Sequence, residues 1–127
     1  MFIPATESVT ESQEYIEKRA EHLNIPVKVQ SKLGIIIDEL YSNVARYSGA
    51  TIVKIKCEPE DDMIRLTLKD NGIEYDPFSN EDPDVSLPAE ERAIGGLGIF
   101  MVKNMAEKVE YERTDGKNIV NIYMKTE

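Results

Sequence analysis

Three short polar stretches, in a fixed order, constrain this chain more than any other feature of its sequence. Glu39 and Asn43 come first, within IIIDELYSN. Asp70-Asn71-Gly72 comes next, and a glycine cluster from Gly95 to Gly98 comes last. Each stretch alone is common in proteins, but their order and spacing together predict a nucleotide site.

The first stretch offers ligands for a cation. Glu39 and Asn43 are four residues apart, which places them on one face of a helix. A carboxylate and a carboxamide in that arrangement can jointly address a divalent cation and a water. The competing interpretation is the solvated edge of a helix whose other side forms core. The apolar residues that we expect in this core are Ile35, Ile36, Ile37 and Leu40.

The second and third stretches offer contacts for a base and for phosphates. Asp70 can accept a hydrogen bond from an exocyclic amine, and Gly72 lets the backbone pass close to a planar ring. The glycine cluster precedes a helix that we expect to begin near Leu97, where free backbone N–H groups favour phosphate oxygens. Taken singly, Asp-Asn-Gly is more often a hairpin turn, and a glycine cluster is more often a hinge.

The hydrophobic pattern predicts helices on one face of an antiparallel sheet. Caps and helical spacing indicate the helices, and alternating apolar residues indicate the strands. The expected helices run from Ser8 or Thr10 to about Leu23, from Val27 to Tyr47 and from Leu97 to Met105. The expected strands are Ile52–Cys57, Met63–Leu68, Val109–Arg113 and Asn118–Met124. The fold class is therefore α+β, a two-layer sandwich of a mixed, mostly antiparallel sheet and a helical layer.

The segment 78–94 is expected to be a loop. It is rich in proline and acidic residues and has no clean period. Because it lies between the Asp70 turn and the glycine cluster, we interpret it as a lid that orders over bound nucleotide. The competing interpretation is a disordered surface insertion.

Composition indicates one compact domain spanning residues 1–127. Hydrophobic residues make up 41% of the chain and charged residues 31%, a globular balance, and Cys57 is expected to be a buried, inert thiol. A net charge of -9 would repel a polyphosphate backbone, which argues against nucleic acid as a partner. No run approaches the roughly twenty apolar residues that span a bilayer, and the start lacks a secretory signal. We therefore expect no membrane contact and a cytoplasmic location.

The motifs resemble those of a known superfamily, the gyrase, chaperone, histidine kinase and mismatch-repair (GHKL) ATPases. An Asn-bearing helix, an Asp-x-Gly turn and a Gly-x-Gly segment occur there in the same order as IIIDELYSNVARYS, LKDNGIEYDP and IGGLGIFMVK do here. The chain is most similar to the small stand-alone branch, the anti-sigma-factor serine kinases. The resemblance covers nearly the whole chain, and its motifs are specific as a set.

The resemblance implies ATP and Mg²⁺ as ligands and a role for each motif residue. Asn43 matches the Mg²⁺-ligating asparagine, and Glu39 matches the carboxylate that acts as general base. Asp70 matches the aspartate that reads adenine, and Gly72 matches the glycine beneath the ring. The resemblance also implies that the phosphates and the ribose are contacted by Arg46, Tyr47, Gly95, Gly96, Leu97 and Gly98.

Two positions depart from the pattern of this family. In the last hairpin the family usually carries a Gly-Thr pair whose hydroxyl supports the adenine contact, whereas this chain reads Asp115-Gly116-Lys117-Asn118. Asn118 offers an equivalent polar group. Many small relatives also carry a histidine shortly after the metal-binding asparagine, where this chain has Arg46.

Two functions are consistent with these residues. The first is a serine/threonine protein kinase, a homodimer that phosphorylates an anti-sigma-antagonist-type protein, with sequestration of a sigma factor as an additional role. The second is a nucleotide-gated binding module with little or no catalysis. Glu39 favours the kinase, since a pure binder needs no base. The catalytic domain of a histidine kinase is disfavoured because no helical hairpin with a phosphoacceptor histidine precedes the domain.

Overall fold

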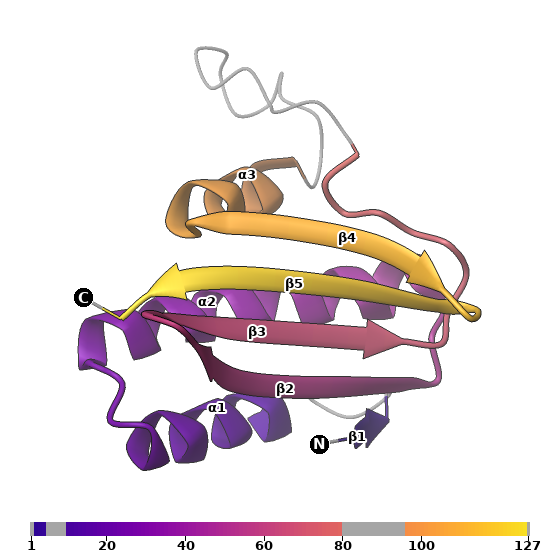
Figure 1. Ribbon diagram of the computed structural model, residues 1–127. Coiled ribbons are helices and arrows are strands. Elements are labelled where there is room, and N and C mark those ends of the chain that lie inside the picture. The colour runs from indigo at the N-terminus through magenta and orange to yellow at the C-terminus, as the bar shows by residue number, and fades with distance from the viewer. Residues whose placement is uncertain (1, 5–9, 80–95, 127) are drawn as a thin grey trace.

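The computed structural model describes residues 2–4, 10–79 and 96–126. Figure 1 shows a sheet with helices gathered on one side of it. The strands are β1 (Phe2–Pro4), β2 (Ile52–Glu60), β3 (Met63–Asp70), β4 (Lys108–Thr114) and β5 (Lys117–Lys125). The helices are α1 (Thr10–His22), α2 (Val27–Asn43), the π-helical turn η1 (Val44–Ser48) and α3 (Gly96–Met105).

The five strands form one sheet in the order β1-β2-β3-β5-β4, and each neighbouring pair is antiparallel. Helices α1 and α2 lie together on one face, and α3 lies beside β4 (Figure 1). The predicted α+β sandwich is confirmed. The register places Asp70, the last residue of β3, directly between Val53 of β2 and Asn118 of β5.

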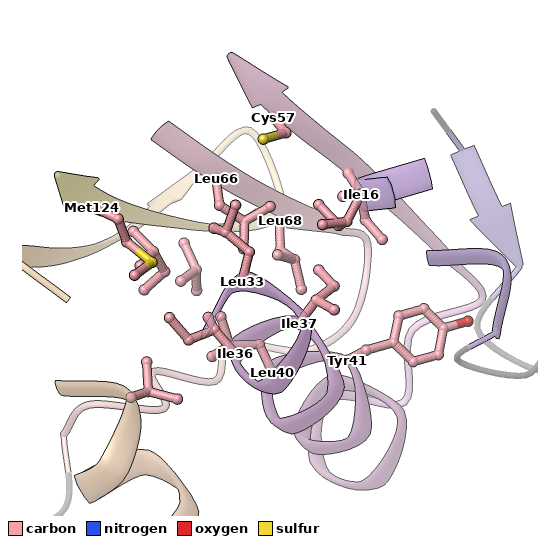
Figure 2. Packing of buried hydrophobic residues seen from close by; sticks show 14 of the residues in the cluster. Ile16, Leu33, Ile36, Ile37, Leu40, Tyr41, Cys57, Leu66, Leu68 and Met124 are labelled. Carbon is pink, nitrogen blue, oxygen red and sulfur yellow. The ribbon is translucent and has the colours of Figure 1, made fainter. Parts of the chain in front are cut away.

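The core lies between α2 and the inner face of the sheet. Every second residue is buried along β3 and from Val53 to Cys57 in β2, as expected for strands with one face covered. Figure 2 shows Leu33 of α2 beneath Leu66 and Leu68 of β3. Ile36, Ile37 and Leu40 are buried as predicted, but Ile35 is 46% exposed. The prediction for Ile35 was wrong because each helical residue turns by about 100°, which carries one member of an Ile-Ile-Ile run out of the buried stripe.

Helix α1 is attached to the middle of β2 at Cys57. The backbone N–H of Cys57 donates to the Tyr15 hydroxyl (3.1 Å), and Nε of Arg19 donates to the Cys57 carbonyl (3.0 Å). Burial raises the pKa of the Cys57 thiol to about 11, so the thiol stays protonated near neutral pH. The predicted buried thiol is confirmed.

Two elements differ from the sequence prediction, and one prediction lies outside the described residues. Strand β1 was not predicted, because three residues carry too little alternation to show a period. The helix expected to run to Tyr47 changes at Asn43 into the π-helical turn η1, which ends at Gly49 with φ of 66°, the left-handed conformation that glycine adopts at helix ends. Of the predicted lid at 78–94, only residues 78 and 79 are described.

Candidate nucleotide-binding site

Asp70 is buried at the end of β3 with one carboxylate oxygen already occupied. Its side chain is 4% exposed. Oδ1 accepts hydrogen bonds from the backbone N–H of Gly72 (2.8 Å) and from Nδ2 of Asn118 (3.0 Å). None of the residues that the structure describes donates to Oδ2. The carboxylate therefore keeps one oriented acceptor, which is what the recognition of an exocyclic amine requires.

Asn118 holds this carboxylate in place. It is 1% exposed, and besides Asp70 its amide donates to the Ile73 carbonyl (2.6 Å). Its Oδ1 accepts from the Tyr75 backbone N–H (3.1 Å) and from the Tyr111 hydroxyl (2.6 Å). Two donors and two acceptor sites are thus all used. Asn118 therefore orients Asp70, and its equivalence to the threonine of the family stays a prediction. We call Asp70, Gly72, Tyr111 and Asn118 the Asp70 cluster.

Gly72 is required by a close approach to Ser48 of η1. A Cβ at this position would overlap the carbonyl, Cβ and hydroxyl of Ser48. The next residue, Ile73, donates its N–H to the Ser48 carbonyl (2.8 Å). On the other side, Arg113 donates to the Gly72 carbonyl (2.8 Å). The turn after β3 is therefore fixed by η1 and by β4 together, and a contact of Gly72 with a ring stays a prediction.

Glu39 and Asn43 lie on one face of α2 and contact each other directly. Nδ2 of Asn43 donates to the Glu39 carboxylate and to the Glu39 carbonyl, each at 2.8 Å. Because the amide nitrogen faces the carboxylate, the amide oxygen points away from it, and none of the described residues donates to that oxygen. Asn43 is 5% exposed and Glu39 is half-buried. An oriented amide oxygen is a suitable ligand for Mg²⁺.

The glycine segment reaches the same carboxylate. A Cβ on Gly98 would overlap the Glu39 carboxyl group, so the first turn of α3 lies against Glu39. Gly96 is the first residue of α3, and Leu97 follows it in the same turn. Gly95 lies outside the described residues. The structure therefore brings Gly98 of α3 next to Glu39 and Asn43 of α2. We call these three residues the Glu39 cluster.

Arg46 and Tyr47 project from η1 at the surface. The Tyr47 ring lies 5.4 Å from the Tyr75 ring, and the Arg46 guanidinium lies 5.7 Å from the Tyr47 centroid, within the range of a cation–π contact. Burial raises the pKa of the Tyr75 hydroxyl, and the charges of Tyr47 and Glu39 raise it further. Tyr75 also contacts the Asp70 cluster, because its backbone N–H donates to Asn118 (3.1 Å). A hollow of about 490 Å³ beside it is lined by Arg46, Tyr47, Ile73 and Arg113 among others.

Sequence reasoning missed Tyr75, Tyr111 and Arg113. Tyr111 and Arg113 belong to β4, and they reach the site only because β4 pairs with β5 beside Asn118. That hairpin is local, but the contact of Arg113 with Gly72, 41 residues earlier, depends on the register between β3 and β5, which a single sequence does not display. Tyr75 follows the Asp70 turn closely, and an aromatic residue at that place was the available hint.

The arrangement defines the class of the protein. An antiparallel sheet is backed by a helix that carries Glu39 and Asn43, and an Asp-x-Gly turn ends a central strand, as in the ATPase domains of the GHKL class. The chain belongs to the histidine kinase-like ATPase domain family, which matches residues 2–124.

Solved structures with this fold include histidine kinases. The blue-light activated histidine kinase EL346 of Erythrobacter litoralis has a TM-score of 0.55 at 17% identity, over 80% of this chain and 32% of that one. Histidine kinase AdeS of Acinetobacter baumannii has a TM-score of 0.52 at 20% identity, over 76% and 47%. The catalytic domain of histidine kinase ThkA has a TM-score of 0.53 at 12% identity, over 99% and 96%. At these identities the likeness shows the fold alone.

The chain corresponds to only part of the larger kinases, since it spans less than half the length of the first two. No curated protein matches the chain. Within the ranges that the structure describes, no helix is both long enough and apolar enough to traverse a bilayer.

Proposed function

We propose that the protein binds ATP with Mg²⁺ and transfers the γ-phosphoryl group to a serine or threonine of a small anti-sigma-antagonist-type protein. The observation that carries this proposal is the Glu39 cluster. There, a half-buried carboxylate is hydrogen-bonded to Asn43 at 2.8 Å and contacts Gly98 at the start of α3. A base, an oxygen ligand for a cation and a helix start that favours phosphate are thus adjacent.

The described residues fit a magnesium nucleotide. Mg²⁺ usually keeps several waters and binds through one or two protein oxygens plus phosphates, so the oxygen of Asn43 is an adequate protein ligand. Asp70 presents its Oδ2 to an exocyclic amine, while Oδ1 is held by Gly72 and Asn118. ATP, when bound, supplies the phosphoryl group. The protein supplies orientation and charge at each end of it.

Glu39 has the geometry of a positioned base. Its Oε1 accepts from Asn43, which leaves Oε2 to accept the proton of an incoming hydroxyl. Transfer of that proton to Glu39 would make the serine or threonine oxygen a better nucleophile. Its bond to the γ-phosphorus would form as the bond from that phosphorus to the β-phosphate oxygen breaks, with ADP as the leaving group. The N-terminal end of α3, which lies against Glu39, carries a partial positive charge and free N–H groups. Both favour binding of phosphate oxygens next to the Glu39 carboxylate.

The remaining parts of the proposal rest on the resemblance to anti-sigma-factor serine kinases. They are a cytoplasmic homodimer, one domain over residues 1–127 with a lid at 78–94, and a sigma factor as an additional partner. Neither nucleic acid nor a membrane is part of it.

One observation favours the alternative, a nucleotide-gated binding module with little or no catalysis. Gly98 and Asn43 both contact the Glu39 carboxylate, which narrows the access of an acceptor hydroxyl. In that case nucleotide occupancy selects the partner, and Glu39 only orients Asn43.

Incubation with γ-labelled ATP, Mg²⁺ and an antagonist-type domain distinguishes the two functions. The kinase proposal expects label on serine or threonine of the partner. ATP-dependent capture of the partner without label would instead establish the binding module. Label on histidine would contradict both and would assign the protein to phosphohistidine chemistry. Calorimetry with ATP and Mg²⁺ on the same preparation checks nucleotide binding independently of the partner.

A further inference from the structure

The outer face of the sheet, opposite the helices, carries a group of lysines at one end. Outward-facing side chains alternate with buried ones along β2, β3 and β5. Lys54 of β2 stands directly opposite Lys69 of β3 in the register. Lys56 lies two residues along β2, and Lys117 begins β5. We call these four residues the lysine patch.

The opposite end of the same face is built differently. There Arg65 lies 3.8 Å from Glu58 and 3.3 Å from Glu60. Lys108 lies 3.7 Å from Glu110. Cations on this part of the sheet therefore have carboxylates beside them, as one expects for a chain with a net charge of -9.

Three of the four lysines in the patch lack a carboxylate beside them in the part of the chain that the structure describes. Lys56, Lys69 and Lys117 form no ion pair with a carboxylate of the described residues. Like charges placed directly opposite on neighbouring strands destabilise a sheet, so the Lys54–Lys69 pair works against folding. The pKa of Lys54 is lowered, first by the charge of Lys56, then by burial and by the charge of Lys69. An anion beside these ammonium groups would relieve the repulsion.

A hollow of about 170 Å³ lies within the patch. It is lined by Ile52, Lys54, Lys69, Asp70, Asn71 and Lys117. Neighbouring strands are about 4.8 Å apart, and Lys54 and Lys56 are about 7 Å apart along one strand. The patch spans three strands, so its area is larger than one small anion can cover. The spacing of its lysines suits several carboxylates carried on one short peptide segment. Ile52, 38% exposed, adds an apolar contact at its edge.

We propose that the lysine patch docks an acidic segment of a partner protein, with carboxylates over the lysines and an apolar side chain against Ile52. A short acidic segment can bind the lysine patch without contacting the acidic surface around it. A long polyanion would also contact that acidic surface and be repelled by it, which disfavours nucleic acid as the partner. The patch lies on the sheet face opposite α2, so this docking site is separate from Glu39 and does not depend on the proposed kinase reaction.

A short oligoglutamate peptide serves as the probe, with titration followed by amide NMR shifts at low and at physiological salt. Binding should shift the amides around Lys54, Lys69 and Lys117. The variants Lys69→Glu and Lys117→Glu should each weaken binding by about tenfold. The matched control, Lys108→Glu at the other end of the same face, should change it by less than about twofold. ATP should not be needed.

Folding is measured on the same variants. Lys69→Glu places opposite charges across from Lys54, so its Tm should equal or exceed that of the wild type. Lost binding with a retained Tm therefore reports the docking site. Failure of oligoglutamate to bind the wild type, or equal losses in the patch and control variants, would overturn the proposal. Tighter binding of an oligonucleotide of equal charge would also overturn it, in favour of a nucleic-acid partner.

Discussion

The Asp70 cluster and the Glu39 cluster, the two ends of the candidate site, are built in different ways. Asp70 and Asn118 are almost completely buried, and every hydrogen-bonding group of Asn118 has a protein partner. Glu39 is half-buried, and among the described residues its carboxylate accepts one hydrogen bond, from Asn43. At the Asp70 end a hydrogen-bonded network orients a single open acceptor, Oδ2 of Asp70, whereas the Glu39 end is held by fewer contacts.

This difference indicates what each end contributes. A buried hydrogen-bonded network is expensive to disturb, because a member left unpaired loses its hydrogen bond but keeps the cost of its burial. The Asp70 cluster should therefore govern nucleotide selectivity and also stability. The Glu39 cluster should govern rate and cation dependence, with little effect on folding.

Glu39→Gln should show the largest effect. The amide keeps the shape of the side chain but cannot accept a proton, so phosphoryl transfer should fall by about 10²–10⁴-fold. ATP affinity and Tm should stay close to the wild type. Asp38→Asn, an exposed neighbour on α2, is the matched control and should leave the rate unchanged. Wild-type transfer by Glu39→Gln would show that this carboxylate is not the base.

Asn43→Ala should remove the dependence of nucleotide binding on Mg²⁺. The variant loses the amide oxygen assigned to the cation and also the hydrogen bond that orients Glu39. We expect a loss of about 10–100-fold in ATP affinity with Mg²⁺ present, and a much smaller loss with EDTA. Isothermal titration calorimetry under both conditions measures the difference. Equal losses in the two conditions would mean that Asn43 does not ligate the cation.

The different origins of the two clusters explain how much of the site could be predicted from the sequence. Glu39 and Asn43 are neighbours because of helical spacing, which is local and visible. The contact between Asp70 and Asn118 joins residues 48 positions apart and depends on the register of β3 and β5. The sequence pattern indicated both strands and placed Asp70 at a strand end, whereas Asn118 was a candidate for the adenine contact only through the resemblance to the family.

The same reasoning applies to the helix end. The sequence predicted that the helix ends at Tyr47, and η1 ends one residue later at Ser48, with Gly49 after it in the left-handed conformation. The π-helical turn before it was not predictable, because it follows from the docking of Ser48 onto the turn at Gly72. Tertiary contact there overrides the local preference for a regular helix.

Asp70→Asn and Asn118→Ala should have intermediate effects that are coupled. Asp70→Asn replaces the acceptor for an exocyclic amine with an amide, at a cost of about 1–3 kcal/mol in ATP binding, and the preference for ATP over GTP should shrink. Asn118→Ala leaves Asp70 with only the hydrogen bond from the Gly72 N–H to hold its carboxylate. A double-mutant cycle on ATP affinity should give a coupling of about 0.5–3 kcal/mol. Strictly additive effects would mean that Asn118 does not act through Asp70.

Asn118→Ala should lower the stability of the fold as well as the affinity for ATP. Asn118→Ala also strips a partner from the Tyr75 N–H and the Tyr111 hydroxyl, so we expect the free energy of unfolding to fall by about 1–3 kcal/mol. Tyr111→Phe is the milder control, since it removes one hydroxyl and keeps the ring. Denaturant unfolding of both variants gives the comparison. An Asn118→Ala protein as stable as the wild type would contradict the account of a preformed cluster.

The smallest effect should come from the contact between the Tyr47 and Tyr75 rings. Tyr47 follows Asn43 in η1, Tyr75 follows the Asp70 turn, and their rings are 5.4 Å apart. Aromatic pairs contribute about 0.5–1.5 kcal/mol beyond burial. A cycle of Tyr47→Leu, Tyr75→Leu and the double variant should give a coupling of that size in the free energy of unfolding. Tyr47→Phe, which keeps the ring, should leave the coupling intact. Zero coupling would mean that the contact between the two rings does not stabilise the fold.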